Sequence, residues 1–238
     1  MSFLKNLFSS KEEPINNYNE FWNWFIQHEK TFHKAVKNQS EIEKTFFNKL
    51  SPKLGELREG YYFLAGMINE NTAELVLTAD GAIKNIGFVE ELVNAAPVID
   101  GWKFTALKPA IDDMSIRMAD YEFSTANISF YYNEDPNYPD EIDIVVVNDD
   151  FNETNKETIT NGTFIFLDNL LGELNFATNV DNITVIGKDK VEKELIPIEK
   201  LKDFLIWREK EFLEKYDGTW RDTETDKHSI LEGTLQNG

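Results

Sequence analysis

The same order of hydrophobic patterns, strand, strand, helix, strand, occurs twice along the chain, and this repeat constrains the fold more than any other feature of the sequence. Strands show as apolar or alternating runs, and helices as apolar residues three and four positions apart. In the first copy the predicted elements are strands at 61–68 and 74–79, a helix at 83–96 and a strand at 101–107. In the second copy they are strands at 127–132 and 141–147, a helix within 153–174 and a strand at 180–186. No residue-level identity links the two copies, so what repeats is the order of the elements.

Helices are predicted on both sides of this repeat. Asn17 or Asn19 can cap a first helix that carries several aromatic residues. Ser40 and Glu43, three positions apart, form a capping box that opens a second helix. Pro197 suits the first position of a last helix, because its missing N–H has no partner at that position in any helix.

These elements together predict the fold class. Antiparallel hairpins joined by one right-handed helical crossover each place their helices against a face of a sheet. We therefore predict an α+β fold: a two-layer, mainly antiparallel sheet with helices on one face, built from the two strand-strand-helix-strand units, the N-terminal helices and a C-terminal helix. Whether the two units share one sheet or build two stays open. The run Val145-Val146-Val147 predicts a central strand, because a continuous apolar run is typical of burial on both faces.

The ends of the chain differ from its middle. Three segments are expected: a flexible N-terminal segment at 1–16, a single α+β domain at 17–216 with candidate subunits 17–110 and 111–216, and a polar tail at 217–238. The tail ends in Asn237-Gly238, a pair typical of a hairpin turn, with no returning strand after it. Two interpretations stay open: the tail is the start of a truncated second domain, or it is a disordered end.

The composition of the 238 residues argues against several classes of function. The chain has 43 Asp and Glu against 24 Lys and Arg, a formal net charge of −19, which argues against binding the phosphates of DNA or RNA. It has no Cys, which excludes thiol catalysis, disulfides, zinc ribbons and iron–sulfur ligation. The sequence has no run of about 18 apolar residues that would span a membrane. Its first residues also lack the apolar stretch of a secretory signal, so a cytoplasmic location is expected.

The motifs that would indicate catalysis or metal binding fail in their spacing. His28 and His33 look like a zinc-protease pair but lie five positions apart, about 140° around a helix, so they cannot clamp one ion. A calcium loop that starts at Asp150 would have Asn155 in place of its glycine and Asn161 in place of its bidentate glutamate. Phosphate-binding glycine loops and a nucleophile elbow are missing from the sequence. We therefore predict no catalytic residue, no cofactor and no metal site.

Acidic residues concentrate in the segment 112–182, which holds sixteen Asp and Glu but only two basic residues. One interpretation is a solvated acidic face that keeps the protein soluble. The other is a docking surface for a basic partner, steered by long-range attraction and anchored by tyrosine. The candidate partner-binding residues are Asp135, Tyr138, Asp140, Asp143, Asp149 and Asp150. A loose cation site formed by four of them, Asp140, Asp143, Asp149 and Asp150, is an alternative.

Tryptophans that lie off the apolar stripe of their helix are candidate contacts with a partner. Trp22 and Trp24 lie two apart on the first helix and point to different sides, so one of them is expected to face solvent or another element. Trp207 lies off the apolar stripe of the last helix. An exposed Trp on either helix would mark a contact with a partner or with a missing domain.

Five motifs carry a resemblance to known proteins: Phe21-Trp-Asn-Trp-Phe25, Glu74-Leu-Val-Leu-Thr-Ala-Asp-Gly81, Phe88-Val-Glu-Glu-Leu-Val-Asn-Ala-Ala-Pro97, Gly101-Trp-Lys-Phe-Thr-Ala-Leu107 and Leu167-Asp-Asn-Leu-Leu-Gly-Glu173. Over about residues 20–200 the chain resembles an uncharacterised family of bacterial cytoplasmic proteins. This resemblance implies a single α+β domain of unknown function, sometimes ahead of another uncharacterised domain. It carries over no catalytic residue.

Three hypotheses about function follow from the sequence. The first is a non-enzymatic interaction domain whose acidic face binds a basic protein, as an inhibitor or a toxin-neutralising partner does. The second is a structural module that serves a missing C-terminal domain and bears an apolar patch beside Tyr216 and Trp220. The third is a carboxylate-dependent hydrolase or small-ligand enzyme, with a pocket that holds two or more carboxylates of shifted pKa.

Overall fold

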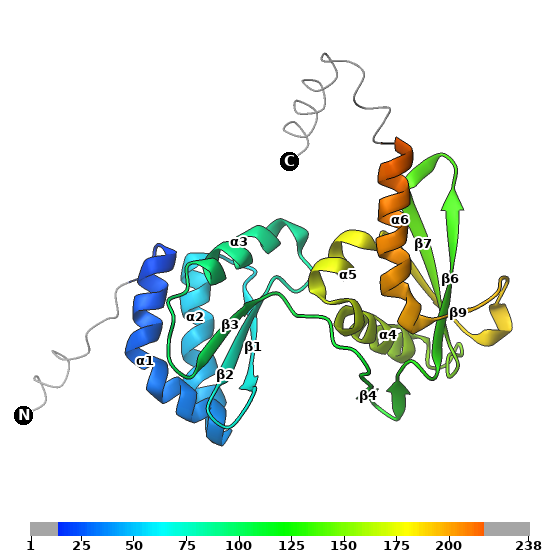
Figure 1. Cartoon of the computed structure of the whole chain (residues 1–238). Coiled ribbons are helices and arrows are strands. Elements are labelled where there is room, and N and C mark those ends of the chain that lie inside the picture. The colour runs from blue at the N-terminus through cyan, green and yellow to red at the C-terminus, as the bar shows by residue number, and fades with distance from the viewer. Residues whose placement is uncertain (1–13, 217–238) are drawn as a thin grey trace, which may run out of the picture. The chain divides into compact units, whose positions relative to one another are not determined.

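The computed structural model describes residues 14–216, except for the side chains of Pro139 and Asp140. Its helices are α1 (Tyr18–Asn38), the π-helical turn η1 (Glu43–Phe47), α2 (Asn48–Leu57), α3 (Ile83–Asn94), α4 (Lys156–Leu171), α5 (Glu173–Asn179), the 3₁₀ turns η2 (Lys188–Lys190) and η3 (Ile198–Lys200), and α6 (Leu201–Tyr216) (Figure 1). Its strands are β1 (Tyr62–Met67), β2 (Ala73–Thr78), β3 (Trp102–Ala106), β4 (Ile116–Met118), β5 (Tyr121–Phe123), β6 (Ile128–Asp135), β7 (Tyr138–Asn148), β8 (Asn182–Ile186) and β9 (Ile196–Pro197). The α+β class predicted from the sequence is confirmed.

The strands form three separate open sheets, with the orders β1-β2-β3, β4-β5 and β8-β7-β6-β9. The repeated order of elements is confirmed: β1-β2-α3-β3 recurs as β6-β7-α4-β8, with α5 added before the last strand. In each copy the first two strands pair antiparallel, and the strand after the helical crossover pairs parallel with the second. The two copies therefore build two sheets and do not share one.

The contacts divide the described residues into two units. Unit 1 comprises 14–110 with 172–177, and unit 2 comprises 111–171 with 178–216. Unit 1 contains the sheet β1-β2-β3, and unit 2 contains the sheets β4-β5 and β8-β7-β6-β9. The segment 172–177 belongs to unit 1, although the chain on both sides of it belongs to unit 2.

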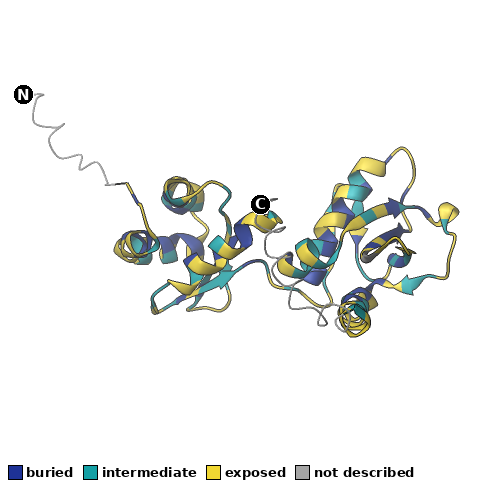
Figure 2. Cartoon of the chain, turned by 90° about the horizontal axis from the view of Figure 1, so that it is seen from above, coloured by how far each residue is buried: buried dark blue, intermediate teal, exposed yellow. Residues whose placement is uncertain are grey.

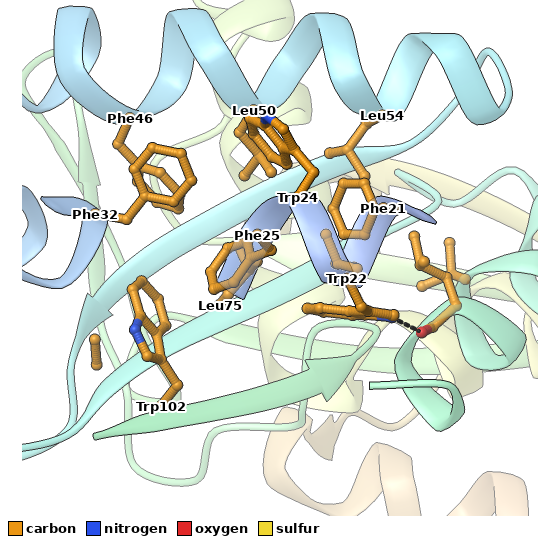
Figure 3. Packing of buried hydrophobic residues seen from close by; sticks show 14 of the residues in the cluster. Phe21, Trp22, Trp24, Phe25, Phe32, Phe46, Leu50, Leu54, Leu75 and Trp102 are labelled. Atoms are coloured by element: carbon orange, nitrogen blue, oxygen red, sulfur yellow. Dashed lines mark hydrogen bonds between the residues drawn. The ribbon is translucent and has the colours of Figure 1, made fainter. Parts of the chain in front are cut away.

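The core of unit 1 is aromatic and lies on one face of its sheet, where α1, α2 and α3 supply its side chains. Trp22 donates its indole N–H to the carbonyl of Leu92 in α3 at 2.8 Å (Figure 3). Its ring meets that of Phe104 edge-on. Trp24 is also buried, beside Phe32. Both tryptophans of α1 therefore face other elements and neither faces solvent, because α1 contacts both the sheet and the α2 helix.

The start of α1 follows the sequence, whereas the start of the second helical segment does not. Asn17 caps α1, since its side-chain oxygen accepts a hydrogen bond from the Glu20 amide at 3.0 Å. The capping box predicted at Ser40 is wrong: the helical segment begins in the π-turn η1, and its N-cap residue Ile42 makes no side-chain cap bond. Glu41, which would be the first helical residue after a cap at Ser40, has a positive φ of 51° and is therefore not in a right-handed helical conformation.

β7 is the central strand that the apolar run predicted. It lies between β6 and β8, and the five residues 144–148 are all buried. On one face Phe204 of α6 packs on Phe130 of β6. On the other face Val191 and Leu195, from the segment after η2, pack on the cluster that contains Val145. Across both units, helices expose one side and bury the other, whereas the central strands are mostly buried (Figure 2).

A glycine in α4 allows the closest packing in unit 2. A Cβ atom at Gly162 would lie 2.1 Å from Cζ of Phe123, which is fully buried on the β4-β5 hairpin. No real Cβ contact is this short, so a larger residue would displace the aromatic ring. Glycine lowers the stability of a helix interior, but at position 162 the packing of Phe123 requires it.

We expect Gly162→Ala to lower the free energy of unfolding by about 1–3 kcal/mol, the usual cost of overpacking a core. Gly87→Ala in α3 is the matched control, because no atom lies within 4 Å of the added Cβ. There alanine should stabilise the helix by about 0.5–1 kcal/mol. Urea unfolding followed by circular dichroism measures both. Equal effects of the two substitutions would contradict the packing of Phe123 on α4.

Candidate functional site

The structure separates five of the six candidate partner-binding residues into two groups. Asp135 and Tyr138 face each other across the turn that joins β6 to β7, and Asp143 lies in β7 beyond them. Asp149 and Asp150 directly follow the opposite end of β7. Asp149 lies six positions after Asp143 along extended chain, a span of about 20 Å. The side chain of Asp140 lies outside the described residues.

The first group lines a shallow hollow at the hairpin end, which we call the hairpin hollow. It has a volume of about 190 Å³ and is lined by Asn133, Asp135, Tyr138, Glu141, Asp143 and Asn182. Strand register explains why these residues meet. Asp143 pairs with Asn133 of β6 on one side and with Asn182 of β8 on the other, so three polar side chains form a row across the sheet.

Alternation along β7 directs these side chains to one face. Glu141 and Asp143 are exposed, whereas Ile142 and Ile144 are buried. Because side chains two apart share a face, Asp143 lies on the same face as Val145. The segment after η2 covers that face at Val145 but not at Asp143. The hairpin hollow is therefore the uncovered end of a face that is buried farther along.

The hairpin hollow is strongly acidic. Three of its six lining residues are carboxylates and none is basic. Asp135 accepts hydrogen bonds from the backbone and side-chain nitrogens of Asn137 at 2.9 and 2.8 Å, which fixes it in the turn. Within the described part of the chain, the carboxylates of Glu141 and Asp143 have no ion-pair partner. Tyr138 is 58% exposed and adds an aromatic ring at the rim.

The second group is engaged in local structure. Asp149 forms an ion pair with Lys188 at 2.7 Å, and Asp150 accepts a hydrogen bond from the Asn127 side chain at 3.3 Å. The neighbouring Glu153 forms an ion pair with Lys190, whose hydrogen bond and charge hold the pKa of Glu153 below its ordinary value. The same pairing raises the pKa of Lys190. Lysines from the turn at η2 thus partly neutralise this end of β7.

The structure gives no support to a metal site. Among residues 14–216 no group of three or more His, Asp or Glu side chains could hold a metal ion. Asp143 lies in the middle of β7 and Asp149 just beyond its last residue, about 20 Å away along the extended chain, which rules them out as ligands of one cation. His28 and His33 contact different backbone carbonyls, those of Trp24 and Asn71, as the five-residue spacing predicted.

The carboxyl groups whose pKa values are clearly lowered lie outside the hairpin hollow, and hydrogen bonds or ion pairs explain each shift. The Asn16 amide, by hydrogen bonding, holds the pKa of Glu20 below its ordinary value at the start of α1. Burial raises the pKa of Glu74, but hydrogen bonds from Lys103 and Thr105 and the charge of Lys103 outweigh it and lower the pKa. The lowered pKa values thus result from a surface ion pair and from hydrogen bonds at a helix cap. A general acid would instead need a raised pKa.

A larger groove in unit 2 has mixed charge. It measures about 440 Å³ and is lined by Glu134, Asp135, Pro136, Arg208, Glu211, Phe212, Lys215 and Tyr216. Arg208 donates to the carbonyl of Glu141 at 2.5 Å. Because cations stand beside the carboxylates of this groove, it attracts a basic side chain less strongly than the hairpin hollow does.

Sequence reasoning missed a buried carboxylate in unit 1. Glu173 is fully buried and accepts hydrogen bonds from the Thr78 hydroxyl at 2.6 Å and from the amides of Ala79, Gly81 and Lys108 at 2.9 to 3.1 Å. Asp80 and Gly81, at positive φ values of 50° and 77°, shape the turn that presents these donors. Nothing in the sequence distinguishes Glu173 from the other 42 acidic residues, since its partners lie 65 to 95 positions away.

Glu173→Ala should lower the free energy of unfolding by roughly 3–5 kcal/mol, because several buried donors lose their charged acceptor. Glu173→Gln should cost less, since it keeps the volume and one acceptor oxygen. Glu90→Ala on the exposed side of α3 is the control, with an expected change within about 0.5 kcal/mol. Chemical denaturation measures all three. A Glu173→Ala protein as stable as Glu90→Ala would show that Glu173 does not hold the 78–81 turn.

None of the helices in residues 14–216 is both long and apolar enough to cross a membrane. No family model, no curated protein and no solved structure matched the chain. The resemblance to an uncharacterised bacterial family therefore stays an expectation, and the function has to be argued from the geometry of the chain itself.

Proposed function

We propose that this protein is a non-enzymatic interaction domain that binds a basic protein partner, and that the hairpin hollow receives a Lys or Arg side chain of that partner. The observation that carries the proposal is the meeting of Asp135, Glu141 and Asp143 in a hollow that no basic residue lines. A guanidinium group can form paired hydrogen bonds with carboxylates and stack on an aromatic ring such as Tyr138.

The distribution of charge supports this proposal. The described residues of unit 2 include 23 Asp and Glu against 10 Lys and Arg, a net charge of −13. Those of unit 1 include 13 against 10, a net charge of −3. A field of one sign speeds the encounter with an oppositely charged partner and suppresses acidic competitors. Unit 2 therefore supplies long-range attraction, and the hairpin hollow supplies the local contact.

The basic partner would be an enzyme that this protein inhibits or a toxin that it neutralises. An acidic surface can recognise such a partner because its charge complements the basic surface of the partner. The site needs no cofactor in this role. Asp149 and Asp150, at the other end of β7, contribute to the long-range field of unit 2 and not to the hollow.

A second candidate function, support of a neighbouring domain, is favoured by α6. Three large apolar side chains of this helix are about half exposed: Ile206, Trp207 and Leu213. The exposure of Trp207 agrees with its predicted position off the apolar stripe. The sequence predicts an apolar patch beside Tyr216 and Trp220, but Trp220 lies outside the described part of the chain.

A fluorescently labelled pentaarginine peptide is a direct probe of the hairpin hollow. We expect Asp143→Asn or Glu141→Gln to weaken binding about three- to fivefold, as the loss of one exposed ion pair does. Binding should also weaken as salt rises from about 0.1 to 1 M. Fluorescence anisotropy measures the dissociation constants.

The matched control is Asp150→Asn, which removes the same charge about 20 Å away along β7. It should change the dissociation constant less than twofold if the hollow makes the contact. If Asp150→Asn and Asp143→Asn weaken binding equally, the peptide follows net charge alone and the hairpin hollow is not the site. A pentaglutamate peptide should not bind.

A further inference from the structure

The outer edge of β1 is a strand edge without the usual protection. Exposed edges are normally protected by charge, proline or short length, because their free backbone groups pair with other strands. Two of the four outer strands in the larger sheets follow this rule: β3 carries Lys103, and β9 has two residues, one of them Pro197. β8 has neither a charge nor a proline, but it carries the polar Asn182 and Thr184. β1 has six residues, Tyr-Phe-Leu-Ala-Gly-Met, with neither a charge nor a proline.

The hydrogen bonding of the β1-β2 hairpin shows which backbone groups of β1 have no partner among residues 14–216. The amide of Ile68 donates to the carbonyl of Thr72 at 2.9 Å, so the backbone of Ile68 points toward β2. In an antiparallel ladder alternate residues direct both their N–H and C=O to the same side. Leu64 and the other even-numbered residues therefore bond to β2, whereas Phe63, Ala65 and Met67 direct their N–H and C=O outward.

The side chains on the open face of β1 are accessible and differ in size. Tyr62 and Leu64 are each 54% exposed. At Gly66 no atom would lie within 4 Å of an added Cβ, so the space over it is empty. Along this face of β1 lie, in order, the ring of Tyr62, the side chain of Leu64 and the open space over Gly66.

We propose that β1 pairs antiparallel with β1 of a second copy of this chain, about a two-fold axis at Leu64, and joins two three-stranded sheets into one of six strands. In this register Leu64 faces Leu64 of the second copy. Phe63 exchanges backbone hydrogen bonds with Ala65 of the second copy, and the ring of Tyr62 covers Gly66 of the second copy. The symmetric pairing repeats each of these contacts.

The sequence of β1 argues for a second copy as the occupant of this edge. About Leu64 each large residue is matched by a small one: Phe63 with Ala65 and Tyr62 with Gly66. An aromatic ring laid over a cross-strand glycine restores the packing that the glycine lacks. This internal match of sizes is what a two-fold interface requires, since one surface must complement itself.

Charge also selects this segment for self-association. Residues 60–68 contain no charged side chain, in a chain of net charge −19. The described residues of unit 1, to which β1 belongs, carry a net charge of only −3, so the unit that pairs is the less acidic of the two. A basic partner would find no carboxylate within this stretch to favour it over a second copy.

Sedimentation velocity of the full chain tests the proposal directly. As the protein concentration rises about hundredfold, the mean mass should rise from 27.6 kDa toward twice that value. The dimer should strengthen between about 0.1 and 0.5 M salt, because salt screens the repulsion between acidic chains. A chain that stays monomeric over this range of concentration and salt overturns the proposal.

A pair of matched substitutions locates the interface. Leu64→Lys places two like charges opposite each other on the two-fold axis and should weaken the dimer at least about tenfold. Leu213→Lys in α6 makes the same change at a leucine that is 53% exposed, and it should leave the dimer unchanged. If Leu213→Lys separates the copies and Leu64→Lys does not, α6 is the interface and β1 is not.

Single cysteines test the register, because the chain has no Cys of its own. Leu64→Cys would set two thiols opposite each other at a pair without hydrogen bonds, with Cα atoms about 4.5 Å apart, within disulfide reach. Mild oxidation should then yield a covalent dimer on a non-reducing gel. Tyr62→Cys places its thiols about 14 Å apart and should not crosslink. Efficient crosslinking of Tyr62→Cys and not of Leu64→Cys would overturn the two-fold axis at Leu64.

These outcomes are independent of those for the hairpin hollow. The β1 variants change unit 1, and the Asp143 and Glu141 variants change unit 2. The two interactions also respond to salt in opposite directions, since the peptide is released by salt and the dimer is strengthened by it. A failure of one proposal therefore leaves the other unaffected.

Discussion

A helix that joins two neighbouring strands of one sheet returns the chain parallel to the strand it left, and the rest of both units depends on this constraint. In the first copy of the repeat the crossover through α3 sets β3 beside β2, and in the second copy the crossover through α4 and α5 sets β8 beside β7. The second strand of each copy thereby becomes interior. β6 gains β9 as a further neighbour, whereas β1 has its free edge outward.

The position of β7 explains why one part of the acidic segment is a better candidate site than the other. An interior strand has a partner on each side, so Asp143 lies in a row with Asn133 and Asn182 and its side chain projects from the sheet. At the far end the chain leaves the sheet at Asp149, where the lysines of η2 form ion pairs with the acidic side chains. The two ends of β7 therefore differ in the number of lysines that pair with their carboxylates, and not in the number of carboxylates.

The two proposed surfaces use different physics. The hairpin hollow relies on charge, which acts over about 10 Å at moderate salt and selects a basic partner. The edge of β1 relies on backbone hydrogen bonds and on the match of large and small side chains, which act only at contact. An acidic chain can use both because most of its net charge belongs to unit 2, whereas β1 belongs to unit 1 and carries no charged side chain.

Local sequence was sufficient for the order of the elements, the α+β class and the central position of β7, because hydrophobic period and apolar runs report directly on exposure. It also determined that His28 and His33 could not converge, since their spacing on a helix is fixed. The tertiary structure alone decided the surroundings of each carboxylate. The register between β7 and β8 places Asp143 beside Asn182, whereas Asp149 forms an ion pair with Lys188. The tertiary structure likewise decided the burial of both Trp22 and Trp24, and of Glu173, whose donors come from segments up to 95 positions away. Contacts of this kind depend on how elements pack against each other, and no pattern within a single element records them.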